Sequence, residues 1–482
     1  MMATRSTLTV TDNRTGHTIE VPIVDNAVRA THFAKLLPPA DRRRRRALEN
    51  AMADGEGEGA TTAGTPVGLR LLDRGLANTA VVASAVSRVD GARGVLTYRG
   101  YRVEDLVNRC SFLDVAHLLI LGEVPDGHRR RHWRTRVMRH TFVHEDCQRM
   151  MTNFRYDAHP MGMLMSSVAA LSTFYPEANP ALEGADVLRT RPSVRHKQTL
   201  RLLGKVPTLA AMAYRRRQGR PYNYPVPGGE LGYVENFLQM LNRIGDFSSA
   251  NYKADPNTRK LIEALFILHA APGGLDSSTA AVRHLASADA DPYTAVAGGL
   301  GCLFGPTHGG EAAAVARMLD FIKTADRVKQ FVANVKAGKV VPAGFGHAVF
   351  AEFDPRARVL RGVLDWGKNA AEIEAQSGHT GKSDTWKVAK ALLRVAASDP
   401  FFKANRLFPN LSFFTGLIFH IMNIPTDMFV VLEAIPRTVG WLAHYVEAVN
   451  DRQRRLVTPQ QIYVGSGMRK VGKGGGQLHS KM

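Results

Sequence analysis

Cysteine is scarce in this sequence, and long uninterrupted hydrophobic runs are missing. The three cysteines, Cys110, Cys147 and Cys302, are an odd number and show no paired spacing. This argues against a disulfide framework and against a thiolate metal site, and it favours a reducing compartment. No apolar run approaches the ~18–20 residues that a membrane helix needs, so we expect a soluble protein without a membrane partner.

Acidic residues are also few relative to basic ones. The chain has 43 Asp and Glu against 63 Lys and Arg, which gives a formal net charge of +20. Such an excess favours polyanionic partners, including nucleic acid, an anionic membrane or a phosphate-rich cofactor. The clusters Arg42–Arg46 and 128–136 (HRRRHWRTR) are not interleaved with several aromatics. This argues against nucleic acid as a partner and favours a solvated helix face or a mobile loop.

What the sequence does contain is a long series of helical patterns. Residues 7–23 alternate on both sides of Asn13-Arg14-Thr15-Gly16 and predict a β-hairpin. After about residue 100, apolar residues recur at helical spacing, and prolines and glycines punctuate the chain. With 45% hydrophobic residues in 482, the composition supports a large core. The sequence therefore predicts an all-α protein behind a short N-terminal β-hairpin.

Two of the predicted helices, around 164–175 and 293–303, are apolar on nearly all faces. In a soluble protein such helices must be surrounded by other helices or by a partner subunit. We therefore expect a homodimer with helices packed across its interface.

Residues 343–356 (AGFGHAVFAEFDPR) suggest a binding site for an organic acid. The glycines let the backbone approach a ligand closely and expose amide donors. The imidazole of His347 can donate to a carbonyl oxygen and act as a general acid. The guanidinium of Arg356 matches a carboxylate, and with Arg437 it provides two such groups for a dicarboxylate.

The order of the motifs is more specific than any single one. Along the chain follow GLANT (75–79), DGARGVLTYRGYRVEDL (90–106), GPTHGG (305–310), GFGH with DPR (344–356), PRTVGWLAH (436–444) and TPQQIYVG (458–465). In this order they resemble the citrate synthase family. The resemblance implies an all-α homodimer with a large and a smaller helical domain that close over oxaloacetate and acetyl-CoA.

The resemblance and the composition together predict the domain boundaries. These are an N-terminal β-hairpin segment (1–30), a basic, glycine-rich mobile insertion (31–68), the first part of the large domain (69–270), a small-domain region with GPTHGG and GFGH (271–390), the C-terminal part of the large domain (391–465) and a flexible tail (466–482).

The family condenses acetyl-CoA with oxaloacetate to citrate and CoA, needs no metal and holds no permanent cofactor. A carboxylate removes a methyl proton, one histidine stabilises the enol, and a second activates the ketone of oxaloacetate. The resemblance implies that His347 activates the ketone and that Arg356, Arg437 and His308 bind substrate. It also implies that the loop 340–347 contacts CoA through Val341, Ala343, Gly344 and Gly346.

The chain departs from the family at positions that carry proton transfer. In PNLSFFTG (409–416), Ser412 stands where the family has its catalytic aspartate, and losing a general base costs about 10²–10⁴-fold in rate. The histidine that the family motif His-Ala-Asp-His-Glu implies for the enol falls on Pro272 or Gly273, whose side chains cannot donate a hydrogen bond. The arginine that normally comes from the partner subunit is replaced by Thr458, although Arg454 and Arg455 are close in sequence.

These departures predict a citrate synthase-type protein with strongly impaired condensation, unless Asp276 or Glu311 replaces the base. The alternative is a pseudoenzyme that binds oxaloacetate or CoA as a regulatory or scaffold subunit and pairs with itself or with an active paralogue. The final residues, Ser480-Lys481-Met482, resemble the serine-lysine-leucine peroxisomal address. We therefore expect a peroxisomal matrix protein, with the mitochondrial matrix or the cytosol as alternatives.

Overall fold

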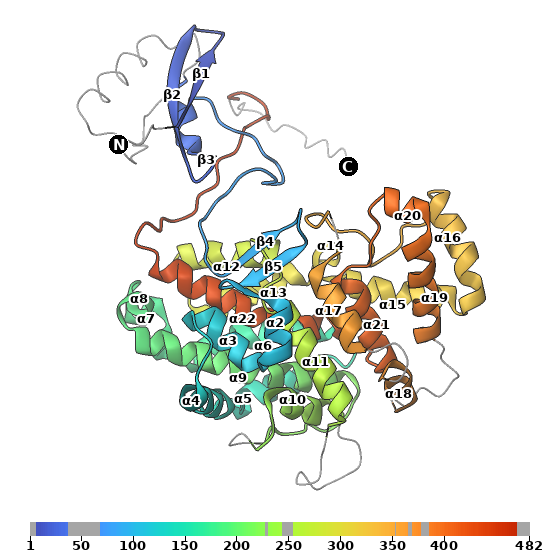
Figure 1. The fold of residues 1–482 in the computed structure, drawn as a ribbon. Helices are drawn as coiled ribbons and strands as arrows, with labels where there is room; N and C mark the ends of the chain where they lie inside the picture. The colour runs from blue at the N-terminus through green and yellow to red at the C-terminus, as the bar shows by residue number, and fades with distance from the viewer. Residues whose placement is uncertain are drawn as a thin grey trace, which may run out of the picture. The chain divides into compact units, whose positions relative to one another are not determined.

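The structure is a computed structural model that forms two compact units, Met1–Ala83 and Ser84–Met482 (Figure 1). The residues it describes are 6–36, 68–226, 230–242, 254–351, 353–364, 369–376 and 385–469. Most of the predicted basic insertion, including Arg42–Arg46, and the terminal Ser480-Lys481-Met482 lie outside the described residues.

Unit 1 contains the predicted hairpin. Strands β1 (Thr7–Asp12), β2 (His17–Val24) and β3 (Ala27–Val28) form an antiparallel sheet in the order β1-β2-β3, followed by the short 3₁₀ helix η1 (Ala30–Lys35). The turn between β1 and β2 ends at Gly16, whose φ of 69° suits glycine. A small apolar cluster stabilises the unit: Ile19, Val21 and Leu36 are buried, with Val10 and Phe33 against them.

Unit 2 contains a three-stranded antiparallel sheet and most of the helices. The strands are β4 (Ser87–Asp90), β5 (Val95–Tyr98) and β6 (Tyr101–Arg102), in that order. The first helices are α2 (Val103–Arg109), α3 (Phe112–Leu121), α4 (Gly127–Met138), α5 (Glu145–Asn153), α6 (Pro160–Leu171), α7 (Pro180–Glu183), α8 (Val187–Thr190), α9 (Pro192–Arg217), α10 (Tyr233–Asn242) and α11 (Pro256–His269). They are followed by α12 (Ser277–Ser287), α13 (Pro292–Leu303), α14 (Pro306–Gly309), α15 (Glu311–Ile322), α16 (Val328–Lys336), α17 (Pro355–Leu364), α18 (Asn369–Gln376), α19 (Thr385–Ser398), α20 (Pro400–Ala404), α21 (Leu411–Ile421) and α22 (Phe429–Asn450). Short 3₁₀ turns are η2 (Ser172–Phe174), η3 (Pro176–Ala178), η5 (Ala325–Arg327) and η6 (Thr426–Met428). The all-α prediction is confirmed.

Helix α22 lies at the centre of the larger helical group. It packs against α3, α9, α11, α12 and α13, and it appears as the long red helix among them in Figure 1. Trp441 and Tyr445 are each 1% exposed, so this helix is surrounded along much of its length. The two helices expected to be apolar on all faces correspond to α6 and α13, which pack against each other within the chain.

A second group of helices follows the GPTHGG turn. Helix α15 packs against α19 and α21, and α19 packs against α16, α20 and α21. The predicted domain boundary between residues 390 and 391 falls inside α19. The division into a large and a small domain stays a prediction.

The basic stretch 128–136 forms most of α4, and part of its charge is used within the chain. Arg129 pairs with Glu123 and Asp126, and the Arg130 guanidinium lies 2.8 Å from the Asp114 carboxylate. Trp133 is buried and donates to the carbonyl of Leu113. Among the described residues, no helix is both long and apolar enough to cross a membrane.

Candidate active site

His347 and Arg356 meet in a loop that leads into α17. Gly344 and Gly346, with φ of 77° and 84°, turn the backbone before the histidine. The Nδ1 atom of His347 accepts from the amides of Val349 (3.0 Å) and Phe350 (3.2 Å), so the proton of the neutral imidazole lies on Nε2. Burial and the neighbouring Arg356 lower the pKa of His347, which favours this neutral form.

The guanidinium of Arg356 is fixed from two sides. It forms a bidentate pair with Asp354, with Nε–Oδ1 3.0 Å and Nη2–Oδ2 2.9 Å, and its Nη1 donates to the carbonyl of Pro272 at 3.2 Å. Only 4% of Arg356 is exposed. Burial opposes its charge, but the Asp354 carboxylate raises the pKa of Arg356, so the arginine stays ionised.

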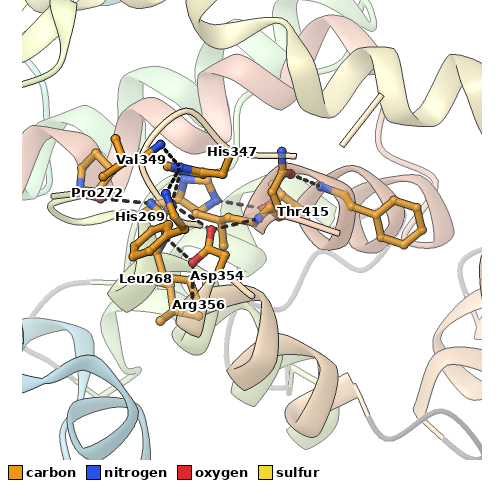
Figure 2. A network of polar contacts seen from close by, with 12 residues as sticks. Leu268, His269, Pro272, His347, Val349, Asp354, Arg356 and Thr415 are labelled. Carbon is orange, nitrogen blue, oxygen red and sulfur yellow. Dashed lines mark hydrogen bonds and ion pairs between the residues drawn. The ribbon is translucent and has the colours of Figure 1, made fainter. Parts of the chain in front are cut away.

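The two donors converge on one point. Arg356 Nη2 lies 3.2 Å from His347 Nε2. Both residues are labelled in the network of Figure 2. Both nitrogens carry protons, because the guanidinium has no acceptor and Nδ1 of the imidazole is already accepting. Two donors at this separation do not satisfy each other, but an oxygen of a bound ligand would satisfy both. The site therefore suits an oxoacid, with its ketone or carboxylate oxygen at this point.

The carbonyl of Pro272 belongs to a loop, residues 270–276, that joins α11 to α12. Tyr98 of β5 positions its start, since the phenol donates to the Leu268 carbonyl (3.1 Å) and accepts from the Ala271 amide (3.3 Å). Gly273, with φ of 99°, turns the loop beneath the sheet. Pro272 therefore contributes a backbone acceptor to the site, while its ring has no donor.

His269, at the end of α11, lies beneath this loop. Its Nε2 lies 2.9 Å from the Thr415 hydroxyl on α21, and both residues are labelled in Figure 2. The Thr415 hydroxyl in turn donates to the Leu411 carbonyl at 3.0 Å. The Thr415 oxygen must therefore accept the His269 proton. Burial lowers the pKa of His269 well below its usual value, so this imidazole is neutral. Its bond to Thr415 indicates a structural role.

Arg437 is paired with an aspartate of the same chain. Its Nη1 donates to Oδ2 of Asp276, while Oδ1 of Asp276 caps α12 by accepting from the Thr279 amide at 2.8 Å. Burial opposes the charge of Asp276, but Arg437 and the Thr279 bonds lower its pKa to about 2. The carboxylate occupies a guanidinium that the resemblance assigns to a substrate carboxylate.

His308 joins the same network from the GPTHGG turn. Its Nε2 lies 2.7 Å from the Ser278 hydroxyl, which also lies 3.2 Å from Oδ1 of Asp276. Burial lowers the pKa of His308, with Asp276 and Arg437 acting in opposite directions. A neutral imidazole is thus held beside Asp276 and Arg437.

Ser412 is the second residue of α21, and the start of this helix is tied to the glycine loop. Asn410 caps the helix through the Phe413 amide (3.2 Å), and its Nδ2 donates to the Gly346 carbonyl and to Glu311 Oε1, both at 2.9 Å. The hydroxyl of Ser412 makes no hydrogen bond to another described residue. The altered position thus follows by two residues an asparagine that is bonded to Glu311.

The loop predicted to contact CoA takes two tight turns beside α21. Gly344 cannot carry a side chain, because a Cβ there would lie 2.8 Å from Phe413 Cα. Val341 is 88% exposed, and Ala343 is partly buried. The structure therefore places Gly344 and Gly346 next to the start of α21 and leaves Val341 exposed, and contact of the four residues with CoA stays a prediction.

Sequence reasoning missed several residues that build this site. Asp354 precedes the proline of DPR, and Asn410 precedes α21 as a helix cap, so both had a local signal. Ser278 had none, and Glu433 was hidden in the apolar run VVLEAIP. Among the described residues, no three His, Cys, Asp or Glu side chains gather in a way that could hold a metal ion.

The fold and the site define an all-helical protein whose paired donors suit an organic anion. The family model for the C-terminal domain of citrate synthase matches residues 75–460. The chain belongs to the citrate synthase family.

Individual relatives agree with this assignment. The peroxisomal citrate synthase of Dictyostelium discoideum is 44% identical over 96% of this chain and 86% of its own length. The glyoxysomal citrate synthase of Cucurbita maxima is 39% identical over 96% of this chain and 83% of its own length. The crystal structure of citrate synthase from Pyrobaculum aerophilum superposes with a TM-score of 0.73 at 27% identity, over 86% of this chain and 99% of that chain.

Proposed function

We propose that the chain binds oxaloacetate and acetyl-CoA but forms citrate much more slowly than an enzyme with an aspartate at position 412. The convergence of His347 Nε2 and Arg356 Nη2 supports oxaloacetate binding. The two nitrogens lie 3.2 Å apart, each carries a proton directed at this point, and none of the described residues supplies an acceptor there. Oxaloacetate offers a ketone oxygen next to a carboxylate, which matches an imidazole next to a guanidinium.

His308 is the imidazole best placed to stabilise an enol. Pro272, the position first assigned to this task, offers only a carbonyl, which is engaged by Arg356. His308 is neutral, partly buried and adjacent to the Arg437–Asp276 pair. The Ser278 hydroxyl donates to Asp276, so it accepts the Nε2 proton of His308; a bound thioester oxygen would take this proton in place of the hydroxyl while a proton leaves the neighbouring methyl group.

The slow step follows from Ser412. Its hydroxyl is a very poor base near neutral pH, and neither acid considered earlier replaces it well. Asp276 has a pKa of about 2 and is bound by Arg437, and Glu311 accepts a hydrogen bond from Asn410. A carboxylate that is weakly basic and already accepts strong hydrogen bonds removes a proton from carbon slowly.

The test combines binding with turnover. Calorimetry should detect oxaloacetate binding by the native chain, and Arg356→Lys should weaken it, because lysine cannot form the bidentate pair with Asp354. CoA release from acetyl-CoA in the presence of oxaloacetate should rise at least about 10²-fold in Ser412→Asp. Native turnover equal to that of Ser412→Asp would contradict the proposal.

The second candidate function is that of a non-catalytic subunit, and one observation favours it. Asp276 neutralises Arg437 from within the chain, which weakens the site as a catalyst more than as a regulated binding site. In this case oxaloacetate or CoA would bind without turnover, in a homodimer or in a heterodimer with an active paralogue. Sedimentation velocity of the purified chain, alone and mixed with an active family member, distinguishes these assemblies.

We also propose a peroxisomal matrix location. The support comes from the terminal Ser-Lys-Met and from the peroxisomal and glyoxysomal relatives. A fluorescent protein fused ahead of residues 466–482 should enter peroxisomes, and deletion of the last three residues should leave it in the cytosol. Mitochondrial staining of the full-length fusion would contradict this location.

A further inference from the structure

Glu433 lies on α22, on the helix face that also carries Arg437 of the candidate site. Arg437 is one turn further along the same face, because side chains at i and i+4 are neighbours on a helix. Val430, one turn earlier, contacts the GPTHGG turn: a Cβ on Gly309 would lie 2.8 Å from its Cγ2. Gly440 touches the loop 270–276, where a Cβ would lie 2.2 Å from the carbonyl oxygen of Ala270. Glu433 therefore sits between the segment that carries His308 and the segment that carries Asp276.

The carboxyl of Glu433 is buried and unused. The residue is 6% exposed, and its carboxyl makes no hydrogen bond or ion pair with another described residue. Neither of its oxygens is among the fully enclosed polar atoms that lack a partner, so the carboxyl keeps a small solvent-accessible surface. A nearly buried carboxyl without a protein partner is costly and calls for a functional or structural reason.

The neighbouring groups bring the pKa of the Glu433 carboxyl into the range that proton transfer near neutral pH requires. Burial raises the pKa of Glu433 to about 7, with Arg437 of its own helix opposing the shift and Glu311 of α15 adding to it. A group that is about half ionised at neutral pH is matched to the work of a general base. Glu311 in turn bonds to Asn410, which caps α21 two residues before Ser412, so Glu433 and the start of α21 share Glu311 as a neighbour.

We propose that Glu433 is the general base that takes over from the aspartate missing at position 412, an inference that rests on the proposed function. The Glu433 carboxylate takes one proton from the methyl group of the acetyl thioester. The C–H electron pair becomes the C=C bond of an enolate, and the carbonyl π pair moves to the oxygen, which accepts a hydrogen bond from His308. The C=C pair then forms the new C–C bond to the ketone carbon of oxaloacetate while the oxygen pair restores the thioester carbonyl. The ketone π pair takes the Nε2 proton of His347, which regains a proton from solvent as Glu433 releases the one it took. Water then adds to the thioester carbonyl, the C–S bond breaks, and CoA leaves as the thiol with one proton of that water.

The other acids near the site are less suited to this step. Asp276 is held ionised by Arg437 and Thr279, which makes it a weak base. Glu311 is exposed and bonded to Asn410. Glu433 alone among these three combines burial, an unpaired carboxyl and a pKa near neutrality.

The experiment measures CoA release and oxaloacetate binding in the native chain, Glu433→Gln and Glu372→Gln, an exposed glutamate of α18 that serves as a matched control. Glu433→Gln should lower CoA release about 10²–10⁴-fold while oxaloacetate affinity stays within about twofold, which also shows that the variant is folded. Glu372→Gln should leave both unchanged. Turnover of Glu433→Gln within threefold of native, or no native turnover despite bound oxaloacetate, would overturn the assignment.

Failure of the proposed function would look different. If the native chain does not bind oxaloacetate, that proposal fails, and Glu433 is then judged by exchange of solvent deuterium into the methyl group of acetyl-CoA. Exchange that Glu433→Gln abolishes and Glu372→Gln keeps supports Glu433 as the base. Absence of exchange in the native chain overturns it.

Discussion

Asp276 uses its two carboxylate oxygens for different purposes. Oδ1 caps α12, and Oδ2 binds Arg437. The first contact stabilises a helix by about 0.5–2 kcal/mol, as such caps do. The second holds the guanidinium that the proposed function assigns to a substrate carboxylate, so a dicarboxylate would have to compete with the protein's own acid.

Asp276→Asn should therefore tighten oxaloacetate binding by about tenfold, which corresponds to about 1.4 kcal/mol. Asparagine keeps the capping oxygen but removes the charge that competes for Arg437. Calorimetry measures the change. Asp399→Asn is the matched control, because Asp399 also caps a helix, through the Phe401 amide, and pairs with Lys336 outside the site. Equal affinities of native chain and Asp276→Asn would show that the pair does not compete.

Glu433 should also affect how stability depends on pH. Its pKa is near 4.5 in the unfolded chain and about 7 in the folded one. The folded state thus binds more protons between these values, and stability is lost as the pH rises from 4.5 through 7. Glu433→Gln removes this loss and should be more stable than the native chain by about 3 kcal/mol at pH 8, but by less than about 1 kcal/mol at pH 5.

Urea unfolding followed by circular dichroism at these two pH values measures the difference. The comparison between them separates the titration of Glu433 from any change in packing, since packing would shift both midpoints equally. A variant that is less stable than the native chain at pH 8 would contradict the buried, unpaired carboxyl.

At the scale of elements, the glycine loop and the start of α21 act as one structure. The Asn410 amide donates to the Gly344 carbonyl at 2.9 Å, and the Gly346 amide donates to the Phe408 carbonyl at 2.8 Å. Asp354 accepts from the Leu411 amide at 3.3 Å and also holds Arg356. The geometry of the oxoacid donors therefore depends on how the loop docks on α21.

Gly344→Ala should disturb this docking. The residue has φ of 77°, and a Cβ would lie 2.8 Å from Phe413 Cα and 2.7 Å from Val315 Cγ2. We expect a loss of about 1–3 kcal/mol in stability together with weaker oxaloacetate binding. Thermal unfolding and calorimetry are the measurements.

Gly362→Ala in α17 is the control for this substitution. A Cβ there has no atom within 4 Å, and alanine favours a helix by about 0.5–1 kcal/mol. A melting temperature that rises for Gly362→Ala and falls for Gly344→Ala separates the loop from a general effect of added methyl groups. Equal changes would contradict the close docking.

The sequence was sufficient for the helices and the first hairpin, but not for the second sheet, β4–β6, or for the pairings between distant residues. Helical spacing located the helices, and the turn at Asn13–Gly16 located the hairpin, since both signals are local. The contact between Asp276 and Arg437 joins residues 161 positions apart, and no local pattern reveals it. Glu433 lies in an apolar helix, where a single acid is easily taken for an exposed position, and only the packing of α22 shows that it is buried.

At the scale of the whole molecule, the two units differ in how much core they have. Among the described residues of unit 1, the buried apolar side chains are Ile19, Val21 and Leu36, whereas the core of unit 2 extends over most of its helices. Local stability follows the number of buried apolar contacts, so the two units should open with different free energies.

Hydrogen exchange measured by mass spectrometry should show this difference. Amides of β1 and β2 should exchange at least about a hundredfold faster than those in the middle of α22, because ~2.7 kcal/mol or more separates their opening free energies. Peptides from α13 provide an internal control, since this helix packs against α22 and should be protected to a similar degree. Equal protection of β1 and α22 would contradict the division into two units.

The loop 270–276 links the two halves of the site. Its Pro272 carbonyl receives Arg356, and its Asp276 receives Arg437. A ligand that draws either arginine away shifts the same short backbone segment. Thermodynamic linkage then requires reciprocity: whatever factor oxaloacetate applies to the affinity for the acyl thioester, the thioester returns to oxaloacetate. Under the proposed function, such a chain would respond to the concentrations of oxaloacetate and the thioester together, even with slow turnover of both.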